Sequence, residues 1–130
     1  MDKKYVELFK ELTRATAVAS EQVMDYDKSK NDEEGFKTAQ RLRDDYEALN
    51  QEIVESGDDW VPDKSQATKL LLASMIQITQ LKDKIEALHK AMVGYNTDLV
   101  PKLQEIVDTA ADDEAAKKMA NEKFILDDNE

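Results

Sequence analysis

Cysteine is absent from this chain of 130 residues, and other residues that build catalytic or metal sites are scarce. Without cysteine there is no disulfide framework, no thiolate metal site and no cysteine nucleophile. The single histidine, His89, excludes any site that needs two imidazoles. Only three glycines are present, and none belongs to a phosphate-binding glycine loop. The absence of cysteine fits a reducing compartment but does not establish one.

Long hydrophobic runs are also missing from the sequence. The longest uncharged stretch, residues 70–81, contains twelve residues, whereas a membrane-spanning helix needs ~20. Residues 1–14 carry seven charged side chains, so they lack the apolar core of a secretion signal. We therefore expect a cytoplasmic protein that does not bind membranes.

The residues that are abundant favour long helices. Charged residues make up 36% of the chain and aromatic residues only 6%, a composition that is typical of helical proteins. Apolar residues recur every three or four positions in four segments, which turn and capping residues separate. We predict one all-α domain, 1–130, folded as an antiparallel up-down-up-down four-helix bundle with long helices and a short acidic C-terminal tail. The predicted helices cover residues 3–29, 33–56, 64–93 and 98–119, and the tail covers residues 120–130.

Apolar stripes predict which face of each helix is buried. The third helix has the longest stripe and is expected to form the centre of the core. The first helix has two apolar lines about a third of a turn apart, and the stronger line is expected to face the core. Small residues in the weaker line would permit close helix packing, or would lie at the surface. In the first helix the stronger line is Tyr5, Leu8, Phe9, Leu12, Thr16, Ala19, Val23 and Tyr26, and the weaker line is Val6, Thr13, Ala17 and Met24. The stripe of the second helix is Ala39, Leu42, Tyr46, Leu49 and Ile53. The stripe of the third helix is Ala67, Leu71, Ser74, Ile78, Leu81, Ile85, Leu88, Met92 and Tyr95.

Helix ends have their own sequence signals. Asn31 followed by Glu34 has the form of a capping box for the second helix. Gly57 is expected to end that helix with a positive φ, which glycine adopts easily. Asp63 with Gln66 predicts the cap of the third helix.

Two motifs suggest metal binding, and both fail on chemistry. Glu86 and His89 have the spacing found in di-iron helical bundles, but such centres need a second Glu-x-x-His pair. Residues 25–36 begin like a calcium-binding loop, yet Lys30 and Phe36 occupy positions that require glycine and glutamate. We therefore predict no metal site, no cofactor and no catalytic residue, and interpret residues 25–36 as a capped turn between helices.

The net charge of −11 points away from nucleic acids and anionic membranes as direct ligands. Acidic residues are concentrated in residues 31–63, which contain eleven acidic and three basic side chains. This segment could complement a basic protein partner, or its charge could serve only to keep the protein dissolved. The candidate contacts on the second helix are Asp44, Asp45 and Glu47.

Two apolar groups do not fit the predicted core. Leu72 and Ile76 project away from the stripe of the third helix, and either Trp60 with Val61 or another subunit could cover them. Residues 124–126 place three large apolar side chains near an acidic end. They either close one end of the bundle or form a docking motif. The candidate partner-binding residues are thus Trp60, Leu72, Ile76, Phe124, Ile125 and Leu126, in addition to the acidic residues of the second helix.

The leading hypothesis is a non-enzymatic protein that binds another protein and modulates or inhibits it. A partner that normally processes nucleic acid would have the required basic surface. The alternative is a structural or assembly subunit of a larger oligomer, as in a phage or secretion apparatus. That alternative predicts burial of Leu72, Ile76, Val6 and Met24 between chains.

Overall fold

The computed structural model of the chain describes residues 2–80 and 99–125. All regular secondary structure in these two ranges is helical, so the all-α prediction is confirmed. None of the described helices is both long and apolar enough to cross a lipid bilayer. The elements are α1 (Lys3–Ser29), α2 (Glu33–Ser56), the short 3₁₀ turn η1 (Gly57–Asp59), α3 (Lys64–Gln80), a helix over residues 99–109, and α5 (Asp113–Lys123).

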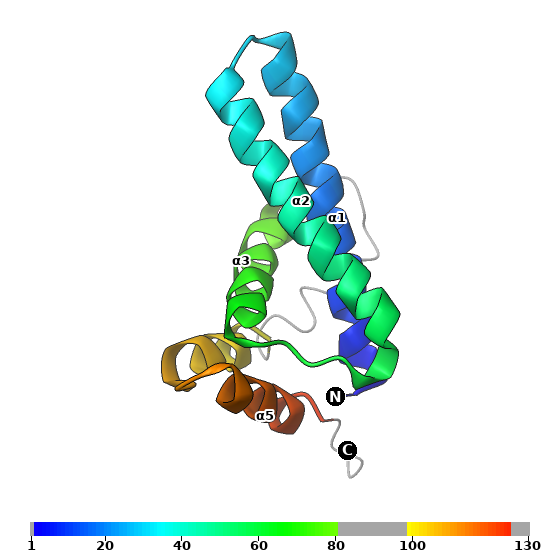
Figure 1. The fold of residues 1–130 in the computed structure, drawn as a ribbon, viewed down its shortest axis with the longest axis vertical. Helices are drawn as coiled ribbons and strands as arrows, with labels where there is room; N and C mark the ends of the chain where they lie inside the picture. Colours follow the sequence, from blue (N-terminus) through cyan, green and yellow to red (C-terminus); the bar gives the residue numbers. More distant parts are fainter. Residues whose placement is uncertain (1, 81–98, 126–130) are drawn as a thin grey trace.

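A long antiparallel hairpin, α1 with α2, dominates the molecule (Figure 1). The turn between them depends on Asn31, which adopts a φ of 59°. Asp32 then caps α2, because its side chain accepts a hydrogen bond of 3.0 Å from the backbone N–H of Gly35. The predicted cap at Asn31 is therefore wrong by one residue. A Cβ at position 35 would lie 2.5 Å from Asp32 Oδ2 and 2.7 Å from Asp27 Oδ2, so a larger residue there would displace these two carboxylates.

The seam of the hairpin, where α1 and α2 pack together, lies along the weaker apolar line of α1. Its four residues are buried: Val6 and Thr13 near the start, and Ala17 and Met24 farther along. Small side chains in this line leave room for α2. Of the two interpretations of this line, close helix packing is confirmed and a surface position is wrong, because α2 covers this side of α1. On α2 the buried residues are Ala39, Tyr46, Leu49 and Ile53.

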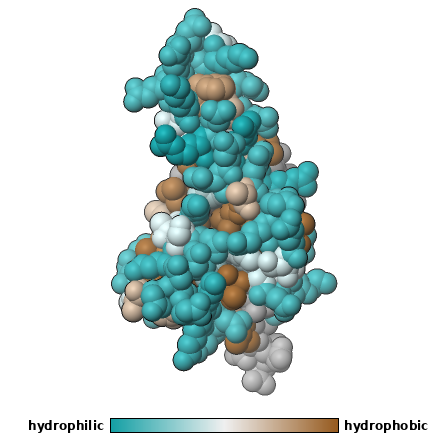
Figure 2. Space-filling view, in the orientation of Figure 1, coloured by the Kyte–Doolittle hydropathy of each residue, from teal (hydrophilic) through white to brown (hydrophobic). Residues whose placement is uncertain are grey.

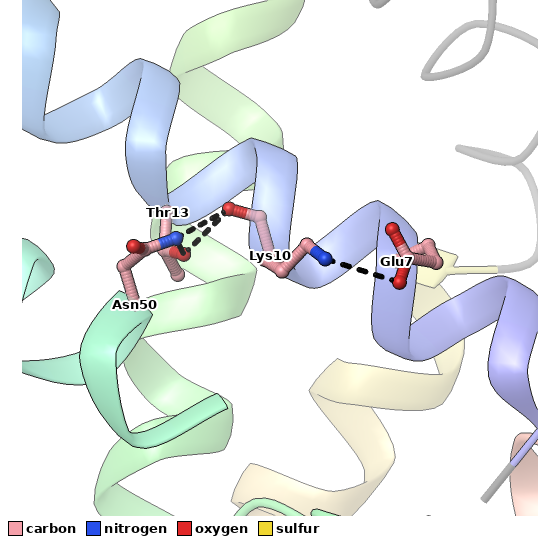
Figure 3. A network of polar contacts seen from close by, with 4 residues as sticks. All are labelled: Glu7, Lys10, Thr13 and Asn50. Atoms are coloured by element: carbon pink, nitrogen blue, oxygen red, sulfur yellow. Dashed lines mark hydrogen bonds and ion pairs between the residues drawn. The ribbon is translucent and has the colours of Figure 1, made fainter. Parts of the chain in front are cut away.

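Polar contacts hold the two helices of the hairpin in register (Figure 3). The side-chain amide of Asn50, on α2, donates to the backbone carbonyl of Lys10 at 2.7 Å and to Thr13 Oγ1 at 3.2 Å. Thr13 Oγ1 in turn donates to the carbonyl of Phe9 at 2.9 Å. These bonds satisfy polar groups that the seam would otherwise bury unpaired.

The other elements pack at the end of the hairpin that carries the N-terminus. Phe9 is fully buried there and makes edge contacts with the ring of Trp60, at 6.3 Å, and with the ring of Phe124, at 5.4 Å. From α2, the hydroxyl of Tyr46 donates to the carbonyl of Lys69 on α3 at 2.8 Å. The core therefore lies at one end of the hairpin rather than along its whole length.

Helix starts and stops are confirmed where capping residues are clear. Asp63 and Gln66 form a reciprocal capping box at the start of α3, with bonds of 2.9 and 2.8 Å. Gly57 ends α2 with a φ of 61°.

The predicted single helix over residues 98–119 is wrong. The chain leaves helical geometry at residues 110–112 and begins again as α5. Asp112 causes the restart, because its side chain accepts a 2.8 Å hydrogen bond from the N–H of Ala115. The helix then continues to Lys123, so residues 120–123 belong to α5 and not to the predicted acidic tail.

The up-down-up-down four-helix bundle is not confirmed by the described residues. The distal half of the α1–α2 hairpin extends past α3, and no other described helix lies beside it (Figure 1). Part of the prediction for the third helix, from residue 81 to 93, lies outside the described residues, as do Glu86 and His89.

Candidate protein-interaction surface

One face of α1 is covered in its first half and open in its second. Tyr5 and Val23 are eighteen residues apart, as are Leu8 and Tyr26, and eighteen residues make about five full turns of an α-helix. The two members of each pair therefore point to the same side. Tyr5 and Leu8 are only 6% and 7% exposed, whereas Val23 and Tyr26 are 49% and 62% exposed. Among the described residues, those outside the hairpin lie beside the first half of this face and not beside its second half (Figure 1).

Leu42 extends the uncovered face onto α2. It lies one helical turn before Tyr46, whose hydroxyl contacts α3, so it belongs to the side of α2 that faces α3. Leu42 is nevertheless 40% exposed. We define the open apolar face as Ala19, Val23, Tyr26 and Leu42.

Asp45 borders this face near the point where α3 covers the hairpin. Burial and, to a smaller extent, the negative charge of Asp45 together raise the pKa of the Tyr46 hydroxyl to about 12. Asp45 lies three residues after Leu42 on α2, so the two side chains are neighbours on the helix surface. Its own side chain is exposed and forms no hydrogen bond or ion pair among the described residues.

Acidic residues cover the second half of α2 and the turn after it. Residues 44–63 contain eight acidic side chains and no basic one. Some have partners within the chain: Asp44 pairs with Arg43 at 3.0 Å, and Glu52 accepts from the indole N–H of Trp60 at 2.8 Å and from Gln66. We define the acidic band as the exposed acidic residues of this stretch without a bonded cation among the described residues: Asp45, Glu47, Glu52, Glu55, Asp58 and Asp59.

A shallow groove of about 420 Å³ lies between α1 and α2, lined in part by Val18 and Glu47. Its charges are mixed, since Arg14 and Glu21 both contribute to it. Arg43 Nη1 also lies 4.0 Å from Glu21, and the hydrogen bond with Asp44 raises the pKa of the Arg43 guanidinium. This groove therefore presents mixed charge, and Glu47 of the acidic band forms part of its lining. The surface of the hairpin is mostly hydrophilic in the view of Figure 2, with hydrophobic patches between.

Trp60 is not a surface residue, and its prediction as a partner contact is wrong. Its side chain is 3% exposed because it packs on Phe9 and bonds to Glu52. Trp60 does not cover Leu72, which is 47% exposed. The neighbouring Met75 is 57% exposed, so α3 has an uncovered outer side. Ile76 belongs to α3, but its side chain lies outside the described residues.

The apolar triplet near the C-terminus divides into residues with different surroundings. Phe124 is fully buried against Tyr5 and Phe9, which agrees with the interpretation that it closes one end of the core. Ile125 is 61% exposed, and Leu126 lies outside the described residues. Phe124 therefore belongs to the core, and docking through Ile125 and Leu126 stays a prediction.

Among the described residues, no group of three or more His, Asp or Glu side chains is arranged to hold a metal ion. A depression of about 440 Å³ at the tip of the hairpin is lined by both acidic and basic side chains, including Asp27, Glu33, Lys28 and Lys37. Counting Asp32, three acidic and two basic side chains line it, so its charge is mixed.

The sequence reasoning did not find the open apolar face, because its residues were assigned to the core. The second apolar line of α1 was the available signal: a helix with two apolar sides needs two sets of neighbours. Comparison of the chain with protein families, with characterised proteins and with solved structures found no match. The functional argument therefore rests on these surfaces alone.

Proposed function

We propose that this protein has no catalytic activity and binds another protein, which it modulates or inhibits. The observation that carries the proposal is the acidic band, whose carboxylates have no bonded cation among the described residues. Eight acidic residues within residues 44–63 repel one another, since no basic residue separates them. A basic surface on a partner would relieve this repulsion and would be attracted over a distance of about 8–10 Å at physiological salt.

The partner class follows from the sign and density of the charge. Complementary charge increases the association rate and selects among partners more than it increases affinity. Proteins that handle nucleic acid have basic surfaces with spaced Lys and Arg side chains. We propose that such a protein is the partner, and that the acidic band competes with its nucleic acid.

Capture of partners from the native cell at low and high salt tests this proposal. The test variant is Asp45→Asn with Glu47→Gln; the control is Glu11→Gln with Glu122→Gln, which changes the net charge by the same amount on other exposed surfaces. We expect a partner that is retained at low salt, released at high salt and lost with the test variant only. Equal loss with both variants, or retention that does not depend on salt, would contradict the proposal.

A second candidate function is a structural subunit of a larger oligomer, and one observation favours it. Leu72 and Met75 leave an apolar outer side on α3 uncovered. The other residues that this hypothesis needed at an interface, Val6 and Met24, are 2% and 6% exposed within the single chain, so that part of it is wrong. Sedimentation at tens of micromolar separates the two functions: a strict monomer removes the structural role.

A further inference from the structure

The side of α1 that points away from the core carries its charges in blocks of one sign, and we call it the outer side of α1. Residues three or four apart share a side of a helix, so Lys10 and Arg14 form a basic block and Glu21 and Asp25 form an acidic block. Val18, which is 47% exposed, lies between the two blocks. Like charges one turn apart repel each other along a helix. An opposite block placed beside each of them would therefore stabilise both.

The groove of about 420 Å³ between α1 and α2 opens on this outer side, so the surface is concave as well as charged. Arg14 lies in the groove and forms no ion pair among the described residues. Glu21 has one distant cation within the chain, since Arg43 Nη1 lies 4.0 Å from it. The lining consists of Arg14, Ala17, Val18 and Glu21 from α1 and of Glu47, Asn50 and Gln51 from α2.

Positive and negative charges balance on the outer side of α1, although the whole chain has a net charge of −11. Within this side, Lys10 Nζ pairs with Glu7 Oε1 at 3.1 Å (Figure 3). From α2, the groove and its edge receive one charge of each sign, Glu47 and Arg43. Charges act over only about 8–10 Å at physiological salt, so the nearest groups decide what can approach. The charged residues of α1 on this side are Lys3, Lys10, Arg14 and Lys28, which are basic, and Glu7, Glu11, Glu21 and Asp25, which are acidic.

We infer that the outer side of α1 is a self-association surface, on which a second copy of this chain docks with its own α1 antiparallel. In a two-fold symmetric pair the same surface of both copies meets, so each contact between two different residues occurs twice. With the two-fold axis between Ala17 and Val18, the basic block of each copy lies opposite the acidic block of the other. The residues directly opposite one another are Arg14 with Glu21, Lys10 with Asp25 and Glu7 with Lys28.

The order of the charges specifies the occupant, its direction and its register. A partner with charges of one sign would match one block and repel the other. A parallel second copy would place every charge opposite the same charge. An antiparallel copy shifted by two turns would place Arg14 opposite Arg14, or Glu21 opposite Glu21. The register centred between Ala17 and Val18 avoids all of these repulsions.

A pair of this kind is closed, because each copy uses the surface that the other offers. It ends at two copies and so differs from the larger oligomer considered above. The inference does not rest on the proposed function. Capture of a partner is measured separately, so failure of self-association leaves the proposed function standing, and failure of capture leaves the dimer standing.

Sedimentation of the full chain tests the inference with two charge-reversal variants. Arg14→Glu places like charges opposite each other twice in a dimer of itself, and so does Glu21→Arg. A mixed dimer with one copy of each variant restores unlike charges at both places. The controls are Arg41→Glu and Glu122→Arg, which make the same charge changes at exposed positions away from the outer side of α1.

We expect the wild type to form a dimer at tens to hundreds of micromolar, with a dissociation constant that rises with salt. Each test variant alone should associate about tenfold more weakly, their equimolar mixture should regain the association of the wild type, and the controls should match the wild type. Four results would overturn the inference: a wild type that stays monomeric, as it would if the face were already covered within the chain; a test variant that associates as the wild type does; a mixture of the test variants that regains nothing; or controls that lose association to the same degree.

Discussion

Replacement of Phe124 by alanine tests how firmly the C-terminal end of the chain is held to α1. The Phe124 ring is fully buried, with its centre 5.2 Å from that of Tyr5 and 5.4 Å from that of Phe9. Lys102 Nζ lies 5.8 Å from the centre of the same ring. The backbone carbonyl of Phe124 accepts a 3.0 Å hydrogen bond from the N–H of Asp2. These contacts join both ends of the described chain.

The expected loss of stability is large. Removing a buried Phe side chain costs about 3–5 kcal/mol, since transfer energy is lost and a cavity remains. The total stability of a domain of this size is ~5–15 kcal/mol, so the variant should still fold but with little reserve. The melting temperature should fall by roughly 10–20 °C. Thermal unfolding followed by far-UV circular dichroism measures this change.

Ile125→Ala is the matched control. Ile125 follows Phe124 directly but is 61% exposed, so its loss should change stability by less than about 0.5 kcal/mol. If both variants melt at the temperature of the wild type, Phe124 does not close the core and the packing of the C-terminal segment is wrong.

Three further predictions concern single side chains. Ser74→Ala should raise stability by up to about 1 kcal/mol in urea unfolding, because Ser74 Oγ is buried and has no hydrogen-bond partner among the described residues; a loss would refute this. Asp112→Ala should cost about 0.5–2 kcal/mol in the same assay, because the cap of α5 is lost, and no change would mean that Asp112 is not a cap. Tyr46 should ionise at about pH 12, since its pKa is raised; its stabilising effect is complete below pH ~10, the usual value in an unfolded chain, and is lost as the pH rises to about 12. Absorbance titration of the wild type against Tyr46→Phe isolates this group, and a difference that titrates near pH ~10 would contradict the prediction.

Signals that act over a few residues were read correctly from the sequence in most cases. The bounds of α1 and α2 agree with prediction, and so do the capping box of Asp63 with Gln66 and the positive φ of Gly57. The break before α5 was predictable in the same way. Asp112 followed by two acidic residues is a typical helix start. The alanines on both sides of it favour helix, so the pattern indicated one continuous helix.

The burial of the Trp60 and Phe124 side chains could not be predicted from the local sequence pattern. Both are large apolar residues outside the long stripes, and both fill the space around Phe9. They reach it from opposite parts of the sequence, because chain folding brings the turn after α2 and the end of α5 to the start of α1. A stripe analysis treats each helix alone and contains no information about such meetings.

Capping signals and side-chain periodicity along the chain were sufficient to determine α1, α2, the turn between them and the start of α3. The tertiary structure alone decided which apolar residues are buried. Tyr5 and Val23 occupy equivalent positions on one helix face, yet one is 6% and the other 49% exposed. The physical reason is that burial depends on a second surface. The periodicity of a helix specifies a side that can be covered, whereas the length and placement of its neighbours decide how much of that side is covered.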